Sequence, residues 1–258
     1  MFYMLMVGLI LAVAAIVSGQ ILDGVSLLAM VQPGAFIIVF GGTVGAVVAQ
    51  SSPKDFLNGI SLLSWLFRPP TSDRETVISE IVRWSRIAYR DGSLQLDKFS
   101  EETKDPLLKS GLEMIVDQVN PENIRDTLLM DIHVRDARLK NAARMWESAG
   151  GYAPTIGILG SVIGLLHVMN GLNDTSKLGP GIASAFVATI YGLVLANLLF
   201  LPLATKLRAM IFELTLRDEL RVEGLAMIAQ NKKPRLVERT LLAAREKADN
   251  ITNIQSAA

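Results

Sequence analysis

The 258-residue chain contains no cysteine and only two histidines. The absence of cysteine excludes disulfides, thiolate metal sites and cysteine nucleophiles. His133 and His167 stand far apart in sequence, and a metal site needs more ligands than these two. The sequence also lacks a glycine-rich phosphate loop, an HExxH motif and any nucleophile–base pair of recognisable spacing. We therefore predict no enzyme activity, no cofactor and no resident metal.

Basic residues are missing from long parts of the chain. Residues 1–53 contain neither Lys nor Arg, and of the 25 basic residues 14 lie in 54–149, one in 173–180 and ten in 206–258. The 25 acidic residues follow nearly the same distribution, so the formal net charge of zero hides a strong segregation. Because both signs are mixed within each polar block, the charge pattern argues against a nucleic-acid-binding surface.

Long apolar segments occupy the regions without charge. Half of the residues are hydrophobic and the mean hydropathy is +0.37. Four segments, 1–18, 28–50, 152–172 and 181–203, are long enough to cross a hydrocarbon core of about 30 Å as helices. The first lacks the positive n-region of a cleaved signal peptide, although its Ala-rich end is compatible with a cleavage site. The sequence thus predicts an all-α, polytopic membrane protein with four transmembrane helices and a helical cytoplasmic domain.

The positive-inside rule orients these spans. Lys54 follows the second span and Lys206 follows the fourth, which places the charged segments in the cytoplasm. Both termini are then cytoplasmic, apart from the extreme N-terminus at the membrane face. The predicted segments are a first transmembrane hairpin, a cytoplasmic helical domain, a second transmembrane hairpin, and C-terminal helices with a tail: 1–50, 51–149, 150–205 and 206–258.

Capping signals and apolar periodicity predict the helices outside the spans. Ser72 with Glu75 forms a capping-box pattern, and Asn120 followed by Pro121 marks the start of a helix that runs to about Ser148. Further helices are predicted at 53–67, 94–102, 105–119, 207–228 and 235–248. The last ten residues, after the final helix, are predicted to form a frayed polar tail.

The four predicted spans contain no Asp, Glu, Lys or Arg. Apart from tyrosines, the only titratable side chain in them is His167, which we interpret mainly as a packing residue and secondarily as a participant in proton traffic. A protein that carries protons or sodium normally needs a carboxylate at membrane depth. Either this protein moves no ion, or a partner supplies the acid.

Small residues form one face on each of the last two spans. They recur at spacings of three and four, together with hydroxyls and a nearby amide: Gly157, Gly160, Ser161 and Gly164 in the third span, and Gly181, Ala185, Ala188, Thr189, Gly192, Ala196 and Asn197 in the fourth. One interpretation is ordinary hairpin packing, with the hydroxyls bonded to the preceding turn. The other is contact with a partner helix along an ion path.

Two prolines lie near the first and last residues of this hairpin in the sequence. Pro154 starts the third span, where proline costs little, and Pro202 lies near the end of the fourth. Pro202 precedes residues that continue as helix, so it leaves a backbone carbonyl unbonded and permits a kink. An ordinary membrane proline kink is the alternative interpretation.

Several stretches together resemble the MotA family of flagellar motor stator subunits in the MotA/TolQ/ExbB superfamily, most closely its MotC-type branch. They cover nearly the whole chain: FGGT at 40–43, GGYAPTIGILGSVIGLLHVM at 150–169, AFVATIYGLV at 185–194 followed by Pro202, and PRLV at 234–237. The resemblance implies an A-type subunit, five copies of which surround two single-span B-type helices in the bacterial inner membrane. It also implies that an Asp of the B-type subunit carries the ion, that B anchors the complex to peptidoglycan, and that ion flow drives torque on the rotor protein FliG.

The resemblance also assigns roles to residues of this chain. Pro154 and Pro202 match the family's two prolines proposed to relay ion binding to the cytoplasmic domain, and Thr189 matches the pore threonine beside the B-type Asp. Ser161 stands where sodium-type members have Thr and proton-type members usually have Ala, whereas His167 resembles proton-type members. We therefore expect protons, with sodium as the alternative. The expected ion path consists of Thr189, Ser161, Gly157, Gly160, Gly164, Ala188, Gly192 and Asn197.

The rotor-facing charges match the family less closely. Asp97 stands at the family's acidic position, after a Gly-Ser-Leu-Gln-Leu run, but the family's arginine falls on Tyr89. Either the adjacent Arg90 takes its place or other charges do. The bland alternative is a solvated pair of little energetic consequence.

Two other functions are alternatives to the interpretation as a stator subunit. An ExbB/TolQ-type energising subunit usually has three spans, and the hairpin 1–50 argues against it. A stand-alone transporter would need an intramembrane charge or broken helices, and neither is clear in the sequence.

Overall fold

The structure, a computed structural model, describes residues 2–24, 26–70, 73–170 and 175–257, and no strand occurs among them. The all-α prediction is confirmed. The chain folds into two compact units, each built from two segments: unit 1 from Met1–Pro69 and Leu139–Arg208, and unit 2 from Pro70–Arg138 and Ala209–Ala258.

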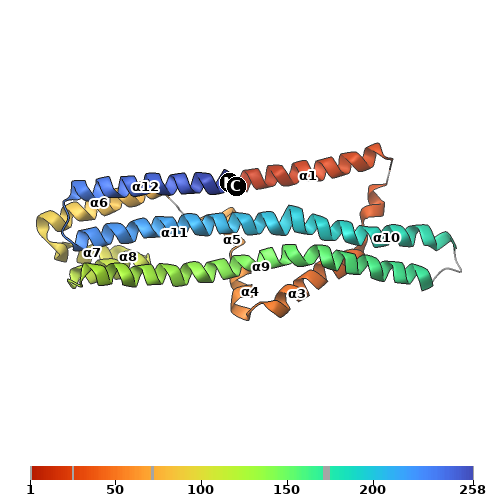
Figure 1. Cartoon of the computed structure of the whole chain (residues 1–258), viewed down its shortest axis with the longest axis horizontal. Coiled ribbons are helices and arrows are strands. Elements are labelled where there is room, and N and C mark those ends of the chain that lie inside the picture. Colours follow the sequence, from red (N-terminus) through yellow and green to blue (C-terminus); the bar gives the residue numbers. More distant parts are fainter. Residues whose placement is uncertain (1, 25, 71–72, 171–174, 258) are drawn as a thin grey trace. The chain divides into compact units, whose positions relative to one another are not determined.

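Unit 1 contains the N-terminal helices and the hairpin between α9 and α10 (Figure 1). Its N-terminal elements are α1 (Phe2–Leu22), the 3₁₀ helix η1 (Leu27–Met30), α2 (Pro33–Phe36), the π-helical η2 (Ile37–Gly41), α3 (Gly42–Gln50), α4 (Pro53–Ser61) and α5 (Ser64–Phe67). The single helix predicted at 53–67 is therefore wrong. The Ser61 hydroxyl donates to Asn58 O and the Ser64 hydroxyl to Ser61 O, which are local bonds of the kind that interrupt a helix.

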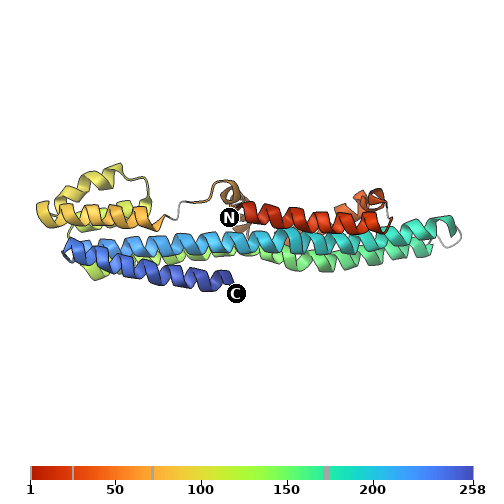
Figure 2. The same ribbon diagram turned by 90° about the horizontal axis from the view of Figure 1, so that it is seen from above.

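The two longest helical segments run further than the sequence predicts. α9 spans Pro121–Asn170 without a break at Ser148, and α10 (Thr175–Val194), the π-helical η4 (Leu195–Phe200) and α11 (Leu201–Ala229) follow one another without a loop. The N-terminus of α9 is confirmed, because the Glu122 amide donates to the Asn120 side chain at 2.9 Å. Figure 2 shows α9 and α10 side by side.

The second span is broken near its start. Instead of one helix over 28–50, η1 ends at Met30, Val31 and Gln32 are extended, and α2 begins at Pro33. Proline disfavours helical backbone in the residue before it, and Gln32 accordingly has φ −123° and ψ 92°. The structure therefore contains the broken helix that the sequence does not reveal.

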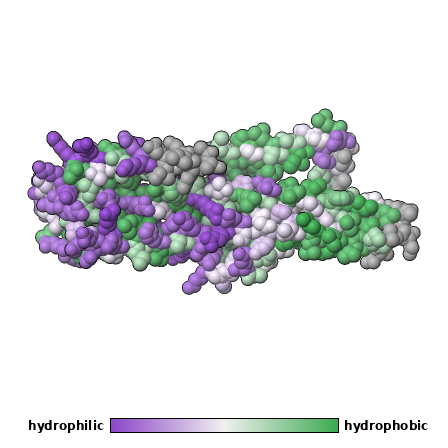
Figure 3. Space-filling model, viewed as in Figure 1, coloured by the Kyte–Doolittle hydropathy of each residue, from purple (hydrophilic) through white to green (hydrophobic). Residues whose placement is uncertain are grey.

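Among the described residues, four helices are long and apolar enough to cross a membrane: Met4–Leu22, Pro33–Gln50, Pro121–Met169 and Leu178–Ala229. Large apolar side chains on α1 and on the α9–α10 hairpin are exposed, among them Leu11 at 64% and Leu166 at 60% (Figure 3). Such exposure fits a lipid-facing surface, because lipid removes the penalty that water imposes on apolar groups. The prediction of four transmembrane helices is confirmed at this level.

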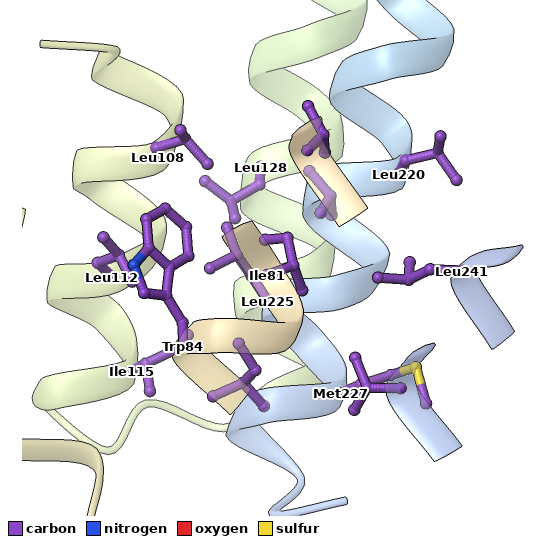
Figure 4. Close-up of a cluster of buried hydrophobic side chains, with 14 of the residues drawn as sticks. Ile81, Trp84, Leu108, Leu112, Ile115, Leu128, Leu220, Leu225, Met227 and Leu241 are labelled. Atoms are coloured by element: carbon purple, nitrogen blue, oxygen red, sulfur yellow. The ribbon is translucent and has the colours of Figure 1, made fainter. Parts of the chain in front are cut away.

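Unit 2 is a helical domain with its own apolar core. Its further elements are α6 (Arg74–Asp91), η3 (Ser93–Leu96), α7 (Asp97–Glu102), α8 (Pro106–Val116) and α12 (Pro234–Ala257). Ile81, Trp84, Leu112, Leu128 and Leu225 meet in this core, and each is at most 2% exposed (Figure 4). Burial of that many large side chains, at roughly 1.5–3 kcal/mol each, gives the unit its main stabilisation.

Two predicted helix ends in unit 2 differ in the structure. Asp73 is the N-cap of α6 and accepts from the Glu75 and Thr76 amides; the predicted cap, Ser72, lies outside the described residues. The Thr76 hydroxyl also donates to the Asp73 carboxylate, and this bond, followed by that from the Thr76 amide, lowers the pKa of Asp73. At the other end, α12 continues to Ala257 because neither glycine nor proline follows Pro234, so the predicted frayed tail is wrong.

A buried ion network ties α9 to α11 within unit 2. The carboxylate of Asp218 is 0% exposed and contacts Arg217 at 2.7 Å, Arg221 at 3.0 Å and Arg135. Arg221 also contacts Asp105, the N-cap of α8, at 2.6 Å. Burial, with the repulsion of Arg221, lowers the pKa of Arg217 to about 10, so it remains charged at neutral pH.

Candidate functional site

The small residues of the last two spans bring α9 and α10 into backbone contact. A Cβ atom added to Gly157 would lie 3.0 Å from Ala188 O and 3.1 Å from the Gly192 Cα. A Cβ on Gly192 would lie 2.5 Å from Ala153 O, a distance that real side chains do not reach. Any larger residue at these positions would force the helices apart.

The remaining small residues continue this contact. A Cβ on Gly164 would lie 3.0 Å from the Ala185 Cα, and one on Gly160 would lie 3.0 Å from the Ala188 Cβ and 3.4 Å from Ile38. Ala188 itself is buried between α9 and η2. The hairpin-packing interpretation therefore accounts for Gly157, Gly160, Gly164, Ala188 and Gly192, and their place in an ion path stays a prediction.

Two hydroxyls face each other across this hairpin. Ser161 Oγ donates to Ala185 O at 2.5 Å and lies 2.6 Å from Thr189 Oγ1. Ser161 has a single hydroxyl proton, so we infer that the proton in the Ser161–Thr189 contact comes from Thr189. Ala185 O is the carbonyl four residues before Thr189, which a helical threonine ordinarily uses itself. The Thr189 oxygen, half-buried, is left with lone pairs that can accept from a carboxylic acid or contact a small cation.

Asn197 and His167 are exposed on the hairpin. Asn197 lies in η4 and donates from Nδ2 to Leu193 O at 2.9 Å, which leaves its carbonyl oxygen able to accept. π-helical turns often occur at functional sites, because the extra residue redirects side chains. His167 lies near the end of α9, six residues beyond Ser161, and no contact in the described structure joins it to the hydroxyl pair.

The two prolines lie at one end of the hairpin. Pro154 is inside α9 and cannot bond Gly150 O, while Pro202 is the second residue of α11, which follows η4. A Cβ added to Gly150 would lie 2.5 Å from the Leu201 side chain, so the turns that hold the prolines are in contact. The π-helical turn before Pro202 is a recognised way to accommodate the missing bond in a membrane helix.

The candidate rotor-facing residues lie in unit 2 and do not contact each other. Arg90 is 80% exposed and binds Asp91 through Nε at 2.9 Å and Nη2 at 2.8 Å. The bonds to Asp91 raise the pKa of Arg90, and the same hydrogen bonds from Arg90 lower the pKa of Asp91. Asp97 begins α7 and is exposed, and no cation in the described part of the chain binds its carboxylate.

Arg86 offers a second exposed cation on α6, about one turn before Arg90 on the same face. It is 67% exposed, and its ion pair with Glu238 is long, at 4.0 Å. Whether Arg90 or another charge takes the place of the family's arginine stays a prediction.

Tyr191 is a site residue that sequence reasoning did not single out. Its hydroxyl donates to Met30 O and accepts from the Gln32 amide at 3.0 Å, so it bridges the break in the second span. The only signal in the sequence is a tyrosine within an apolar run, since a buried tyrosine hydroxyl requires a partner.

The described residues contain no cluster of three or more His, Asp or Glu side chains able to hold a metal. The hairpin offers oxygen acceptors and close helix contact, and its two spans, 152–172 and 181–203, contain no Asp or Glu.

Comparison with known proteins agrees with this architecture. The family described as MotA/TolQ/ExbB proton channel matches residues 99–219, and that described as Motility protein A N-terminal matches residues 6–87. Motility protein A of Bacillus subtilis is 34% identical over 241 residues, which cover 92% of this chain and 88% of the relative.

Two solved stator structures share the fold. The flagellar MotAB stator complex from Bacillus subtilis matches with a TM-score of 0.84 and 34% identity, covering 92% of this chain and 93% of the matched chain. The C. jejuni MotAB structure matches with a TM-score of 0.88 and 27% identity, covering 95% and 96%.

Fold and site define a polytopic helical membrane subunit whose last two spans, 152–172 and 181–203, carry hydroxyls and prolines but no Asp, Glu, Lys or Arg. The chain belongs to the MotA/TolQ/ExbB proton channel family, among the motility protein A members. The MotC-type branch stays a prediction.

Proposed function

We propose that this chain is the A-type stator subunit of a bacterial flagellar motor, a channel-type protein and not an enzyme. With a B-type partner it forms an ion path that couples proton flow to rotation and to torque on FliG. The observation that carries the proposal is the pair of hydroxyls between two spans, 152–172 and 181–203, that contain no Asp, Glu, Lys or Arg, in a chain that matches stator subunits over nearly its whole length. The match of residues 6–87 to the Motility protein A N-terminal family favours this over an ExbB/TolQ-type subunit.

The partner proposed is a single-span B-type subunit, MotB- or MotD-like, whose Asp completes the site. Thr189 would accept a hydrogen bond from the protonated Asp, and Ser161 would hold the Thr189 proton within the hairpin. Asn197 and the small residues Gly157, Gly160, Gly164, Ala188 and Gly192 would let helices approach along the same path. Five copies around a B-type dimer, in the lipid of the inner membrane, would complete the assembly.

Removing the Thr189 hydroxyl tests this site. We expect Thr189→Val, which keeps the shape, to abolish swimming in cells that express the chain with its B-type partner, because the ion-loaded acid loses its acceptor. Thr189→Ser keeps the hydroxyl and should retain motility. If the valine variant swims normally at normal expression, Thr189 is not part of the ion path.

The choice of ion has a separate test. We expect the rotation rate to be unchanged when potassium replaces sodium in the medium, and to fall when a protonophore collapses the proton gradient. Loss of rotation in potassium would mean that the path carries sodium, with Ser161 in the role of the sodium-type threonine.

Coupling to the rotor is proposed to involve the two prolines of the hairpin and charged residues of unit 2. Pro154 and Pro202 would pass movement of the hairpin to the cytoplasmic helices, and Arg90 with Asp97 would face FliG. Two observations support this: the proline-bearing turns contact each other, and the Asp97 carboxylate is exposed, with no cation of the described residues bound to it. Since Asp91 already binds Arg90, Arg86 is a further candidate for the cation.

Charge reversal separates these cations. We expect Asp97→Lys and Arg86→Glu each to reduce torque strongly without reducing ion flux, and Arg90→Glu to have the smaller effect. Torque is measured on tethered cells and flux on vesicles that contain the complex; Pro202→Ala in the same assays tests the coupling role. An Arg90→Glu effect larger than that of Arg86→Glu would return the role to Arg90.

Topology also remains a proposal: residues 51–149 and both termini face the cytoplasm, with the extreme N-terminus at the membrane face. Because the chain has no cysteine, single introduced cysteines can be tested for labelling from either side of the membrane.

A further inference from the structure

The break in the second span exposes backbone groups that the apolar surroundings do not satisfy. Met30 ends η1 and Pro33 begins α2. Some backbone carbonyls and amides around Val31 and Gln32 therefore have no hydrogen-bond partner within a helix. Unpaired backbone groups in or near the hydrocarbon region are costly, and a break is tolerated where protein groups replace the lost bonds.

One phenol from α10 replaces two of these bonds. Tyr191 Oη donates to Met30 O and accepts from Gln32 N at 3.0 Å. Two turns earlier on the same face of α10, Ser184 Oγ hydrogen-bonds Gln32 Oε1 at 3.3 Å. Both residues therefore fasten the same short break to one helix.

Apolar contacts hold the same interface in register. The Tyr191 ring packs edge-on against Phe36, with centroids 5.9 Å apart and an angle of 87°. Between Tyr191 and Ser184, Ala188 is buried against Ala35 and Val39. Tyr191 is thus fixed at its ring as well as at its hydroxyl.

The opposite side of this helix carries the hydroxyl pair. Thr189 lies two residues from Tyr191 and points toward Ser161 of α9, whereas Tyr191 points toward α2. α10 is consequently held between two neighbours, and any rotation or sliding at the break would move Thr189 relative to Ser161.

We propose that Tyr191 is a positioning residue for the ion path: its hydroxyl fastens the break in the second span to α10 and so fixes Thr189 opposite Ser161. The proposal rests on the proposed stator function. Ser184 contributes in the same way through the Gln32 side chain, and its removal has the smaller effect because only a side-chain bond is lost.

The test is Tyr191→Phe, which removes only the hydroxyl, in the full chain expressed with its B-type partner. Torque steps in a bead assay give both the number of engaged stators and the speed that each contributes. We expect the speed per stator to fall by about threefold or more at an unchanged stator number, since small misplacements of a reacting group have large rate effects. Ser184→Ala should lower it in the same direction by less.

Tyr152→Phe is the matched control. The Tyr152 hydroxyl also joins the two hairpins, through Gln50 Oε1 at 2.6 Å, but that bond is exposed and water can replace it. Its speed per stator should equal that of the unmodified chain. Fewer stators at full speed in Tyr191→Phe, or no change in either quantity, would overturn the positioning role. If the unmodified chain itself fails to drive rotation, the proposed function fails instead.

Discussion

Replacing Gly192 with alanine is expected to disrupt the hairpin, although alanine normally stabilises a helix. An added Cβ would lie 2.5 Å from Ala153 O and 3.1 Å from the Gly157 Cα, and both neighbours are backbone atoms that no side-chain rotation can move. The overpacking should cost about 1–3 kcal/mol, more than the roughly 1 kcal/mol that alanine gains over glycine in a helix. We expect a lower thermal midpoint of the detergent-solubilised complex and loss of motility.

Gly179→Ala provides the control on the same helix. Gly179 also lies in α10, but nothing approaches its Cβ position within 4 Å, so that variant should be neutral or slightly stabilising. Equal midpoints for the two variants would show that α9 and α10 are not in backbone contact at Gly192. The two variants are distinguished by the sign of the change in thermal midpoint, which does not depend on how much of each variant is expressed.

Replacing Asp218 with alanine should have a still larger effect on unit 2. The carboxylate is 0% exposed and is contacted by Arg135, Arg217 and Arg221, so its removal leaves buried cations without their counter-ion. Breaking a buried ion pair from one side typically costs about 3–5 kcal/mol. Because burial already lowers the pKa of Arg217 to about 10, the loss of the carboxylate should lower it further.

The unfolding midpoint of the full complex, followed by tryptophan fluorescence, measures this loss, because Trp84 lies in the core of unit 2. Asp126→Ala removes an exposed carboxylate from α9 and should change the midpoint little. If both aspartate variants unfold at the same temperature, the buried network does not stabilise the unit.

The helix boundaries show where local signals suffice. Asn120 and Pro121 start α9 as predicted, because an N-cap depends on its own residue and the amides just beyond it. The same reasoning misplaced the end of that helix at Ser148, since Gly150 is compatible with helix where Leu201 of α11 packs against it, and α9 also accommodates Pro154. The break at Gln32 was missed for the opposite reason: the residues that stabilise it lie more than 150 positions away.

The sequence by itself determined the helical class, the four spans, the absence of a carboxylate in them and the resemblance to stator subunits. These properties follow from composition, charge and short motifs, which act along the chain. Only the tertiary structure decided that the glycines face the other helix of the same hairpin, that Ser161 takes the carbonyl Thr189 would use, and that Tyr191 fastens a broken span. Each of these depends on which helix lies opposite, and periodicity defines a face of a helix without naming its neighbour.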